Sequence, residues 1–306
     1  MLDLRSQIGR FEFMNKLTSE DRARILHLLC EGQSIRAITR VTGASKNTVA
    51  KLLCDAGRFC MAYHDVNVRN VAAKRIQVDE IWSFIYAKQR KVSAAKAAPV
   101  GAGDVWTWTA IEADTKLIVS YFVGGRDGER AMWFIDDLAS RLANRVQLTS
   151  VGHKAYLEAV EGAFGCDVDY AIINKIYGTA PDAFKGRYSP AECIGVKKER
   201  IEGNPDRAHV STSYVERNNK TMRMHMRRFT HLTDGFSKKV ENHACTVALH
   251  MMYYNFGRIH STLRMTPAMA AGVSDSLWEV SEIVALIEAD EANTVTKRGP
   301  YKKRFA

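Results

Sequence analysis

Apolar residues recur at helical spacing in the first part of the chain, and a residue that can cap a helix begins each run. Thr18, Ser34 and Ser45 stand at these starts, where a side-chain oxygen accepts a hydrogen bond from the first helical turn. Gly32 and Gly43 follow the first two runs, where glycine commonly ends a helix. The pattern predicts three short helices.

Beyond Val71 the apolar residues change to the alternating or continuous patterns that are typical of strands. The segments are Ile76 to Ile85, Val105 to Ile111 and Leu117 to Val123. Because these strands follow one another along the chain, we expect them to pair as an antiparallel meander.

Helices then alternate with strands. The expected order is a helix at Glu129 to Leu142, a strand at Val146 to Val151, a helix at Tyr156 to Phe164 and a strand at Asp169 to Ile173. The segment Asn174 to Val210 is expected to be a long irregular connection. The sequence therefore predicts an α/β fold with a mixed five-stranded sheet flanked by helices, preceded by an all-α N-terminal domain.

Charge changes this picture by suggesting a partner. The 306 residues include 44 Lys and Arg against 34 Asp and Glu, a net charge of +10, which favours a polyanion such as nucleic acid. The longest nearly apolar run, Ala244 to Tyr254, is too short and too polar to cross a bilayer. Residues 1–13 lack the apolar core of a secretory signal, so we expect a cytoplasmic protein.

The region around the second and third predicted helices resembles the helix-turn-helix of resolvases and transposases. The matching residues are Ser34-Ile35-Arg36-Ala37-Ile38, Thr42-Gly43-Ala44-Ser45 and Thr48-Val49. In that motif the last helix enters the major groove and the preceding one contacts phosphates. The expected DNA contacts are Arg36 and Arg40 on phosphates, with Ser45, Lys46, Asn47, Thr48 and Lys51 facing the groove. An ordinary helical hairpin is the alternative.

Two acidic residues stand out by position. Asp79 lies in the middle of the first predicted strand, where a carboxylate is costly unless it is paired or binds a metal. From Glu216, the residues Asn219, Lys220 and Arg223 recur on one helical face, which suits a metal ion and a phosphate. For either acid alone, a surface carboxylate beside a cation is the alternative.

Four segments carry a wider resemblance. They are Val78-Asp79-Glu80-Ile81-Trp82, Leu148 to Tyr156, Tyr214 to Asn219, and the late segment Tyr254 to Ala268. In their order and spacing the sequence resembles bacterial insertion-sequence transposases of the DDE class, most of all the insertion sequence one family. The similarity spans residues 14–272.

This resemblance implies an RNase H-like catalytic domain with a triad of two aspartates and a glutamate. Such a triad holds two Mg²⁺ ions, for which Mn²⁺ substitutes. Asp79 and Glu216 map onto the first and last members as catalytic and metal-binding residues. The implied reaction is 3′-end nicking and strand transfer between element ends, bound at terminal inverted repeats, and target DNA. Because two ends must meet, we expect a homo-oligomer, at least a dimer on DNA.

The second aspartate of that pattern is missing. Val151 occupies its position, directly before Gly152 and His153, and valine offers no oxygen to a hard cation. Histidine is a poor Mg²⁺ ligand, so His153 is expected at the edge of the site. We expect impaired catalysis with DNA binding retained. The alternatives are a catalytically dead DNA-binding regulator of the element and a metal-dependent hydrolase without strand transfer.

A second basic segment, Arg217 to Lys239, contains the single acid Asp234. The residues expected to contact DNA there are Lys220, Arg223, Arg227 and Arg228. A solvated helix face is the alternative. The expected domains are a helix-turn-helix domain at residues 14–60, an RNase H-like domain at 75–272, and a C-terminal helix with a basic tail at 273–306.

Overall fold

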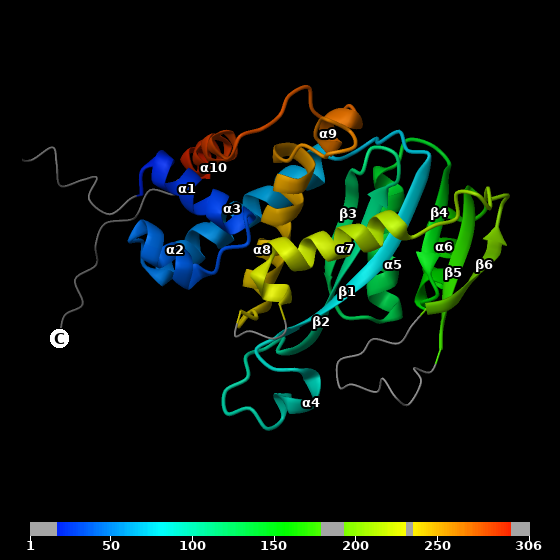
Figure 1. The fold of residues 1–306 in the computed structure, drawn as a ribbon, viewed down its shortest axis with the longest axis horizontal. Helices are drawn as coiled ribbons and strands as arrows, with labels where there is room; N and C mark the ends of the chain where they lie inside the picture. Colours follow the sequence, from blue (N-terminus) through cyan, green and yellow to red (C-terminus); the bar gives the residue numbers. More distant parts are fainter. Residues whose placement is uncertain (1–16, 179–192, 231–234, 295–306) are drawn as a thin grey trace, which may run out of the picture.

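The computed structural model describes residues 17–178, 193–230 and 235–294, and it places a group of helices at one end and a sheet at the other (Figure 1). The expected basic tail from residue 295 onward lies outside the described residues. Within them, no helix combines the length and the apolar character needed to cross a membrane.

The N-terminal helices are α1 (Ser19–Cys30), α2 (Ile35–Thr42) and α3 (Lys46–Asn67). Each begins where the sequence predicted. The side chains of Thr18, Ser34 and Ser45 accept hydrogen bonds from the backbone N–H groups of Asp21, Ala37 and Thr48, respectively. Gly43 follows α2 with a φ of 76°, a left-handed conformation that glycine adopts without strain. The prediction of three capped helices is confirmed.

Helix α3 continues past residue 60, where the N-terminal domain was expected to end. At Gly57 it passes close to α8 (Val240–Met252), where a Cβ atom would overlap Cys245. Gly57 therefore allows two helices to cross closely. Because this crossing joins the N-terminal helices to the rest of the molecule, α3 spans the expected boundary, and the division into domains stays a prediction.

The sheet has the order β3-β2-β1-β4-β5-β6. Its strands are β1 (Arg75–Ile85), β2 (Gly103–Glu112), β3 (Ile118–Gly124), β4 (Val146–Val151), β5 (Val168–Tyr177) and β6 (Cys193–Glu202). Strands β1 to β3 form the predicted antiparallel meander, and β4 and β5 extend the sheet in parallel with β1. The order of β1 to β5, a meander followed by two parallel strands, is that of the RNase H-like fold.

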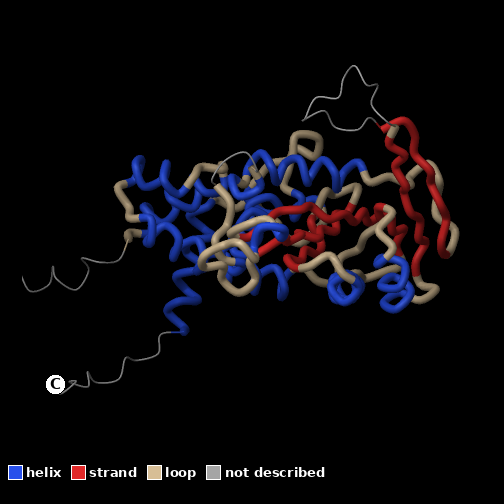
Figure 2. The backbone as a smooth tube through the Cα atoms, turned by 90° about the horizontal axis from the view of Figure 1, so that it is seen from below, coloured by secondary structure: helices blue, strands red, loops and turns tan. Residues whose placement is uncertain are grey.

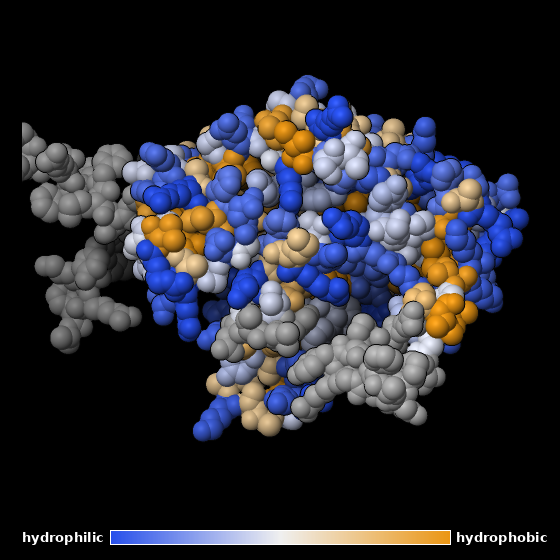
Figure 3. Space-filling model, viewed as in Figure 1, coloured by the Kyte–Doolittle hydropathy of each residue, from blue (hydrophilic) through white to orange (hydrophobic). Residues whose placement is uncertain are grey.

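The prediction of five strands is wrong, because β6 makes a sixth. It pairs with β5 in an antiparallel hairpin, within the segment that was expected to be irregular. Almost every residue of β6 is exposed, so its sequence carries no alternation of buried and exposed positions. Ile176, Ile194 and Val196 leave apolar surface at this edge of the sheet, which Figure 3 shows.

Helices cover both faces of the sheet (Figure 2). Helices α5 (Gly128–Arg141) and α6 (Ala155–Phe164) lie on one face, where Trp108 of β2 packs against Phe134 and Tyr156. Helix α7 (Ser213–His225) crosses β1 on the other face (Figure 1). A short α4 (Gln89–Val92) lies in the loop between β1 and β2.

The C-terminal part returns to the N-terminal helices. After α7 come the 3₁₀ turn η4 (Arg227–Phe229), α8, the π-helical turn η5 (Tyr253–Gly257), α9 (Pro267–Ala270) and α10 (Val280–Thr294). Helix α10 packs against α1, where the guanidinium of Arg22 forms ion pairs with Glu288, at 2.9 Å, and with Glu291. Residues far apart in the sequence thus form one helical layer at this end of the molecule (Figure 1).

Candidate catalytic site and nucleic-acid interface

The expected catalytic positions meet in one open groove of about 530 Å³ under α7. Asp79 lies on β1, Val151 at the end of β4 and Glu216 on α7. In the parallel pairing of β1 and β4, Val78 lies opposite Ser150, so Asp79 and Val151 follow as neighbours on the same face. The structure therefore brings Val151 to the place where the resemblance implied a second carboxylate.

A side chain of β1 anchors the start of α7. The Gln77 Oε1 atom accepts hydrogen bonds from the backbone N–H groups of Tyr214 at 2.8 Å and Val215 at 3.2 Å. These are among the N–H groups that lack a partner within a helix. Gln77 shares the face of Asp79, two positions away, so one strand supplies both a carboxylate and the anchor that holds Glu216 above it.

Lys175 of β5 gives the groove a cation. Its Nζ atom lies 2.5 Å from Glu216 Oε2, and the other carboxylate oxygen accepts a hydrogen bond from Thr212 Oγ1 at 2.6 Å. The sequence reasoning missed Lys175 because it lies in the segment expected to be irregular. Lys175 lies two residues after Ile173, which pairs with Val151. Residues two apart on a strand share a face, so a longer predicted strand would have placed Lys175 at the site.

Asp79 is held by an amide. Asn219 Nδ2 donates a hydrogen bond to Asp79 Oδ2 at 2.8 Å. Burial raises the pKa of Asp79 to about 7, and the negative charges of Glu80 and Glu216 act in the same direction, while Lys175 opposes them. Asp79 therefore changes its protonation state close to neutral pH.

Glu80 points to the opposite face of β1 and is fully engaged. Its side chain is 2% exposed; Arg126 Nε donates to Oε1 at 2.7 Å and the Tyr156 hydroxyl donates to Oε2 at 3.0 Å. His153 lies at the rim of the groove, as expected, and its Nδ1 accepts a hydrogen bond from the backbone of Ala155 at 3.0 Å. These groups brace the edge of the groove.

The residues in the groove do not fit a pair of Mg²⁺ ions. Val151 presents only methyl groups, and Lys175 already neutralises one carboxylate oxygen of Glu216. Across the described part of the chain, no three His, Cys, Asp or Glu side chains are placed together to hold a metal ion. The groove thus has Asp79 on the sheet, Glu216 on α7, and the ammonium group of Lys175 paired with Glu216.

The helix-turn-helix residues lie on the outer surface of α2 and α3. Those predicted to contact DNA are exposed, except Thr48, which is half-buried. The Ser45 oxygen is engaged in capping α3, and Lys51 Nζ lies 2.5 Å from Asp55 Oδ2. The exposed cations of α2 and of the start of α3 are available to phosphates.

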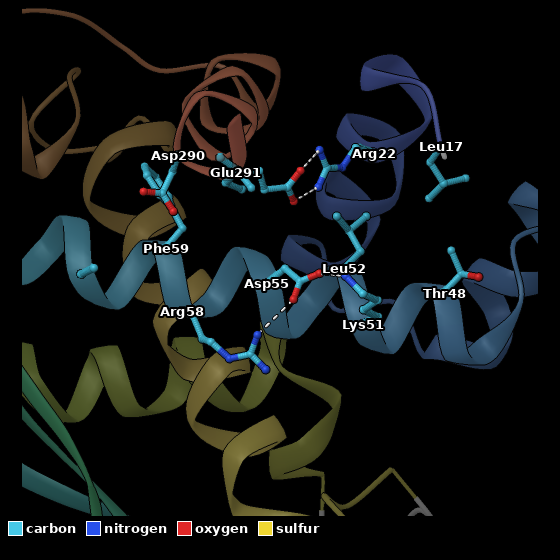
Figure 4. Close-up of a pocket in the computed structure, with 12 residues that line it drawn as sticks. Leu17, Arg22, Thr48, Lys51, Leu52, Asp55, Arg58, Phe59, Asp290 and Glu291 are labelled. Carbon is cyan, nitrogen blue, oxygen red and sulfur yellow. Dashed lines mark hydrogen bonds and ion pairs between the residues drawn. The ribbon is translucent and has the colours of Figure 1, made fainter. Parts of the chain in front are cut away.

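A second groove, of about 670 Å³, lies between α3, α1 and α10. Figure 4 shows Thr48 and Lys51 on α3 and Arg22 on α1, with the guanidinium of Arg22 pointing to Glu291. Acidic and basic side chains alternate around this groove and form ion pairs, for example Arg58 with Asp55 at 3.0 Å. Because its charges are mixed, this groove is a packing interface between helices. It lacks the excess of cations that an anion-binding site needs.

The predicted basic residues near Glu216 divide into two groups. Lys220, Arg223 and Arg227 are exposed, and Arg223 lines the groove with Asp79 and Glu216. Arg228 is half-buried and donates a hydrogen bond to the buried Ser237 hydroxyl at 3.0 Å; burial lowers the pKa of its guanidinium. Arg228 therefore serves the interior, and the surface available to DNA consists of the other cations.

Comparison with known proteins identifies the N-terminal segment. Residues 15–54 match a family of helix-turn-helix domains. This segment is therefore similar to helix-turn-helix domains, in agreement with its three capped helices. The match includes every residue of α2 and α3 that was predicted to contact DNA.

For the rest of the chain, the fold is assigned from the strand order of the sheet. No curated protein matches the sequence. The cryo-EM structure of a piggyBac transposase synaptic complex with hairpin DNA is similar with a TM-score of 0.36 and 10% identity, over 97% of this chain and 81% of that chain. At this TM-score the likeness does not establish a common fold. The RNase H-like assignment depends on the strand order.

Proposed function

We propose that this protein is a DNA-binding transposase of the DDE class, similar to insertion-sequence transposases, whose catalytic centre lacks one carboxylate. The observation that carries the proposal is the meeting of Asp79, Val151 and Glu216 in one groove under α7. The helix-turn-helix domain supports double-stranded DNA as the partner, with terminal inverted repeats read by α3.

The residues of the groove have separate tasks in this proposal. Arg223 and Lys220 hold a DNA phosphate at the groove, since both are exposed cations on α7. Asn219 orients Asp79, and Lys175 balances Glu216. Bound Mg²⁺ or Mn²⁺ supplies the charge that stabilises phosphodiester displacement in two-metal sites. Since the residues present do not fit a pair of ions, we expect strongly impaired 3′-end nicking and strand transfer.

Binding of DNA does not depend on the missing carboxylate. The helix-turn-helix lies at the other end of the molecule from the groove (Figure 1), and a valine repels phosphates less than an aspartate does. The proposal includes a homo-oligomer, at least a dimer on DNA, acting in the cytoplasm on element ends and target DNA.

The test compares Val151→Asp with the unchanged protein. A duplex that the protein prefers is first selected from a random library, then labelled and incubated with each protein and Mg²⁺ or Mn²⁺. Val151→Asn, which matches the shape of aspartate without its charge, is the control. We expect cleavage and strand transfer only with Val151→Asp, at least about a hundredfold above the other two, because a lost metal ligand costs several kcal/mol of transition-state stabilisation.

The other outcomes are distinct. Cleavage by the unchanged protein would place the second carboxylate elsewhere and contradict the proposal. Cleavage by none of the proteins, with specific binding retained, would favour a regulator of the element without catalytic activity. The ion pair between Lys175 and Glu216 is the observation that favours this second candidate, because it stabilises the groove without a metal ion.

A further inference from the structure

Helix α7 has a second functional face. Its residues Tyr214, Arg217, Asn218 and Thr221 line a pocket of about 180 Å³ on the side away from Glu216 and Arg223. The opposite wall comes from the late segment that follows the π-helical turn, including Arg258 and His260. This late segment is part of the sequence resemblance, but none of its residues lines the groove that contains Asp79 and Glu216.

Cations converge on this pocket without a compensating acid. Lys116, Arg217 and Arg258 line it together with His260, and no Asp or Glu does so among the described residues. Burial is the largest cause that lowers the pKa of His260, and the positive charges of Lys116, Arg258 and Arg217 lower it further. On β2, the Oε2 atom of Glu112 accepts hydrogen bonds from the backbone N–H groups of Asp114 and Thr115.

Lys116 is held in place by the fold. It is only 8% exposed, its Nζ atom donates to the carbonyl of Ala113, and the same atom lies 3.2 Å from the ring centroid of Tyr214. Burying an ammonium group without a carboxylate partner is costly. The ring and the carbonyl offset part of this cost, and an anion in the pocket would offset more.

A buried amide adds a second observation. Asn218 is 2% exposed; its Nδ2 donates only a long hydrogen bond to Met222 Sδ, at 3.6 Å, and its Oδ1 has no donor within the described structure. The amide oxygen and nitrogen exchange places by a half-turn, which here breaks only that weak contact. Either way round, one polar atom of this buried amide beside the pocket lacks a strong partner.

We propose that this pocket binds a phosphate group of the DNA backbone. Arginine, lysine and histidine around a small cavity suit the oxygens of a phosphate, and the excess of positive charge favours an anion. The DNA source of the phosphate rests on the function proposed above. The pocket and the groove lie on opposite sides of α7, and a helix with its side chains is about 10–12 Å across, which matches about three nucleotides along a strand. One helix would thus hold the same DNA at two places.

The test removes charge from the pocket without disturbing the buried lysine. The variant is Arg217→Gln with His260→Gln, since Arg217 is exposed and glutamine is polar but carries no charge. Arg264→Gln is the matched control, because Arg264 is an exposed cation of the same late segment that does not line the pocket. The affinity for duplex DNA is measured over a range of salt concentrations, and the melting temperature is measured in inorganic phosphate and in chloride at equal ionic strength.

We expect the pocket variant to bind duplex DNA about tenfold more weakly at low salt and to lose about 0.9 from the slope of log K against log salt, whereas Arg264→Gln keeps the slope. We also expect inorganic phosphate to raise the melting temperature of the unchanged protein and of Arg264→Gln, and not of the pocket variant. Equal behaviour of the two variants would overturn the proposal. A phosphate effect without a change of slope would overturn DNA as its source. Neither readout requires cleavage, so an inactive Val151→Asp leaves this result standing.

Discussion

The two faces of α7 carry charge in opposite ways. Toward the groove, Glu216 is paired with Lys175 and Asp79 with the amide of Asn219, so the protein supplies partners for its own acids. Toward the pocket, Lys116, Arg217 and Arg258 converge, and no acid of the described residues lines it. A site balanced from within is stable without a ligand, whereas a site of like charges gains stability only when an anion arrives. Helix α7 therefore separates a groove whose acids have partners within the protein from a pocket whose cations, in our proposal, are balanced by a ligand.

The largest expected effect concerns the anchor that both faces share. In Gln77→Met the shape is kept but the acceptor for the backbone N–H groups of Tyr214 and Val215 is lost. Unpaired buried donors cost about 1–3 kcal/mol each, so we expect about 2–4 kcal/mol less stability in urea unfolding. A loss of less than about 1 kcal/mol would show that α7 is held by other contacts.

The next effect is a dependence of stability on pH that originates in the groove. Because the pKa of Asp79 is raised from 3.8 to about 7 in the folded protein, folding favours its protonated form, and this contribution to stability is lost as pH rises from about 4 to 7. Asp79→Asn removes the loss, and its amide oxygen still accepts from Asn219. We expect the variant to be more stable than the unchanged protein by about 2–4 kcal/mol at pH 8 and equally stable near pH 3.5.

Denaturant unfolding at both pH values measures this difference. If the two proteins differ in free energy of unfolding by the same amount at both pH values, Asp79 titrates as an ordinary surface carboxyl. The contrast between the two faces of α7 would then not hold for the groove.

The smallest effect comes from the protein's own cation. Lys175→Met leaves Glu216 with Thr212 as its partner, and because the pair is partly exposed we expect a loss of only about 1 kcal/mol. The same change removes the charge that lowers the pKa of Asp79, so the pH at which Asp79 titrates should rise. Lys197→Met, on the neighbouring strand, removes an exposed lysine and is the control. An unchanged titration of Asp79 would place Lys175 outside the electrostatics of the groove.

Local signals in the sequence were sufficient for part of the structure. Capping residues such as Thr18 and Ser45 act within a single turn, and the alternation along β1 reflects its own burial, so both were predictable. The parallel strands β1 and β4 placed Val151 beside Asp79 once their order was known. Strand β6 carried no signal, because its side chains are exposed on both faces.

The details of the sites depend on contacts between distant segments. Lys175 meets Glu216 only because β5 continues past Ile173, and Gln77 acts on a helix that lies far along the chain. The pocket combines Lys116 from a turn with the late segment around His260, a meeting that no spacing in the sequence encodes. Arg228 was expected to contact DNA because it lies in a basic segment, but its side chain donates a hydrogen bond to the buried Ser237.

In the proposed function, Val151 occupies the position of the second carboxylate in a metal centre built on Asp79 and Glu216. Titration with Mn²⁺, followed by electron paramagnetic resonance of the free ion, tests it without DNA, in the unchanged protein, Val151→Asp and Val151→Asn. We predict Mn²⁺ binding at least about tenfold tighter in Val151→Asp than in the other two, and its loss in Val151→Asp with Glu216→Gln. Equal Mn²⁺ affinity in all these proteins would contradict the claim.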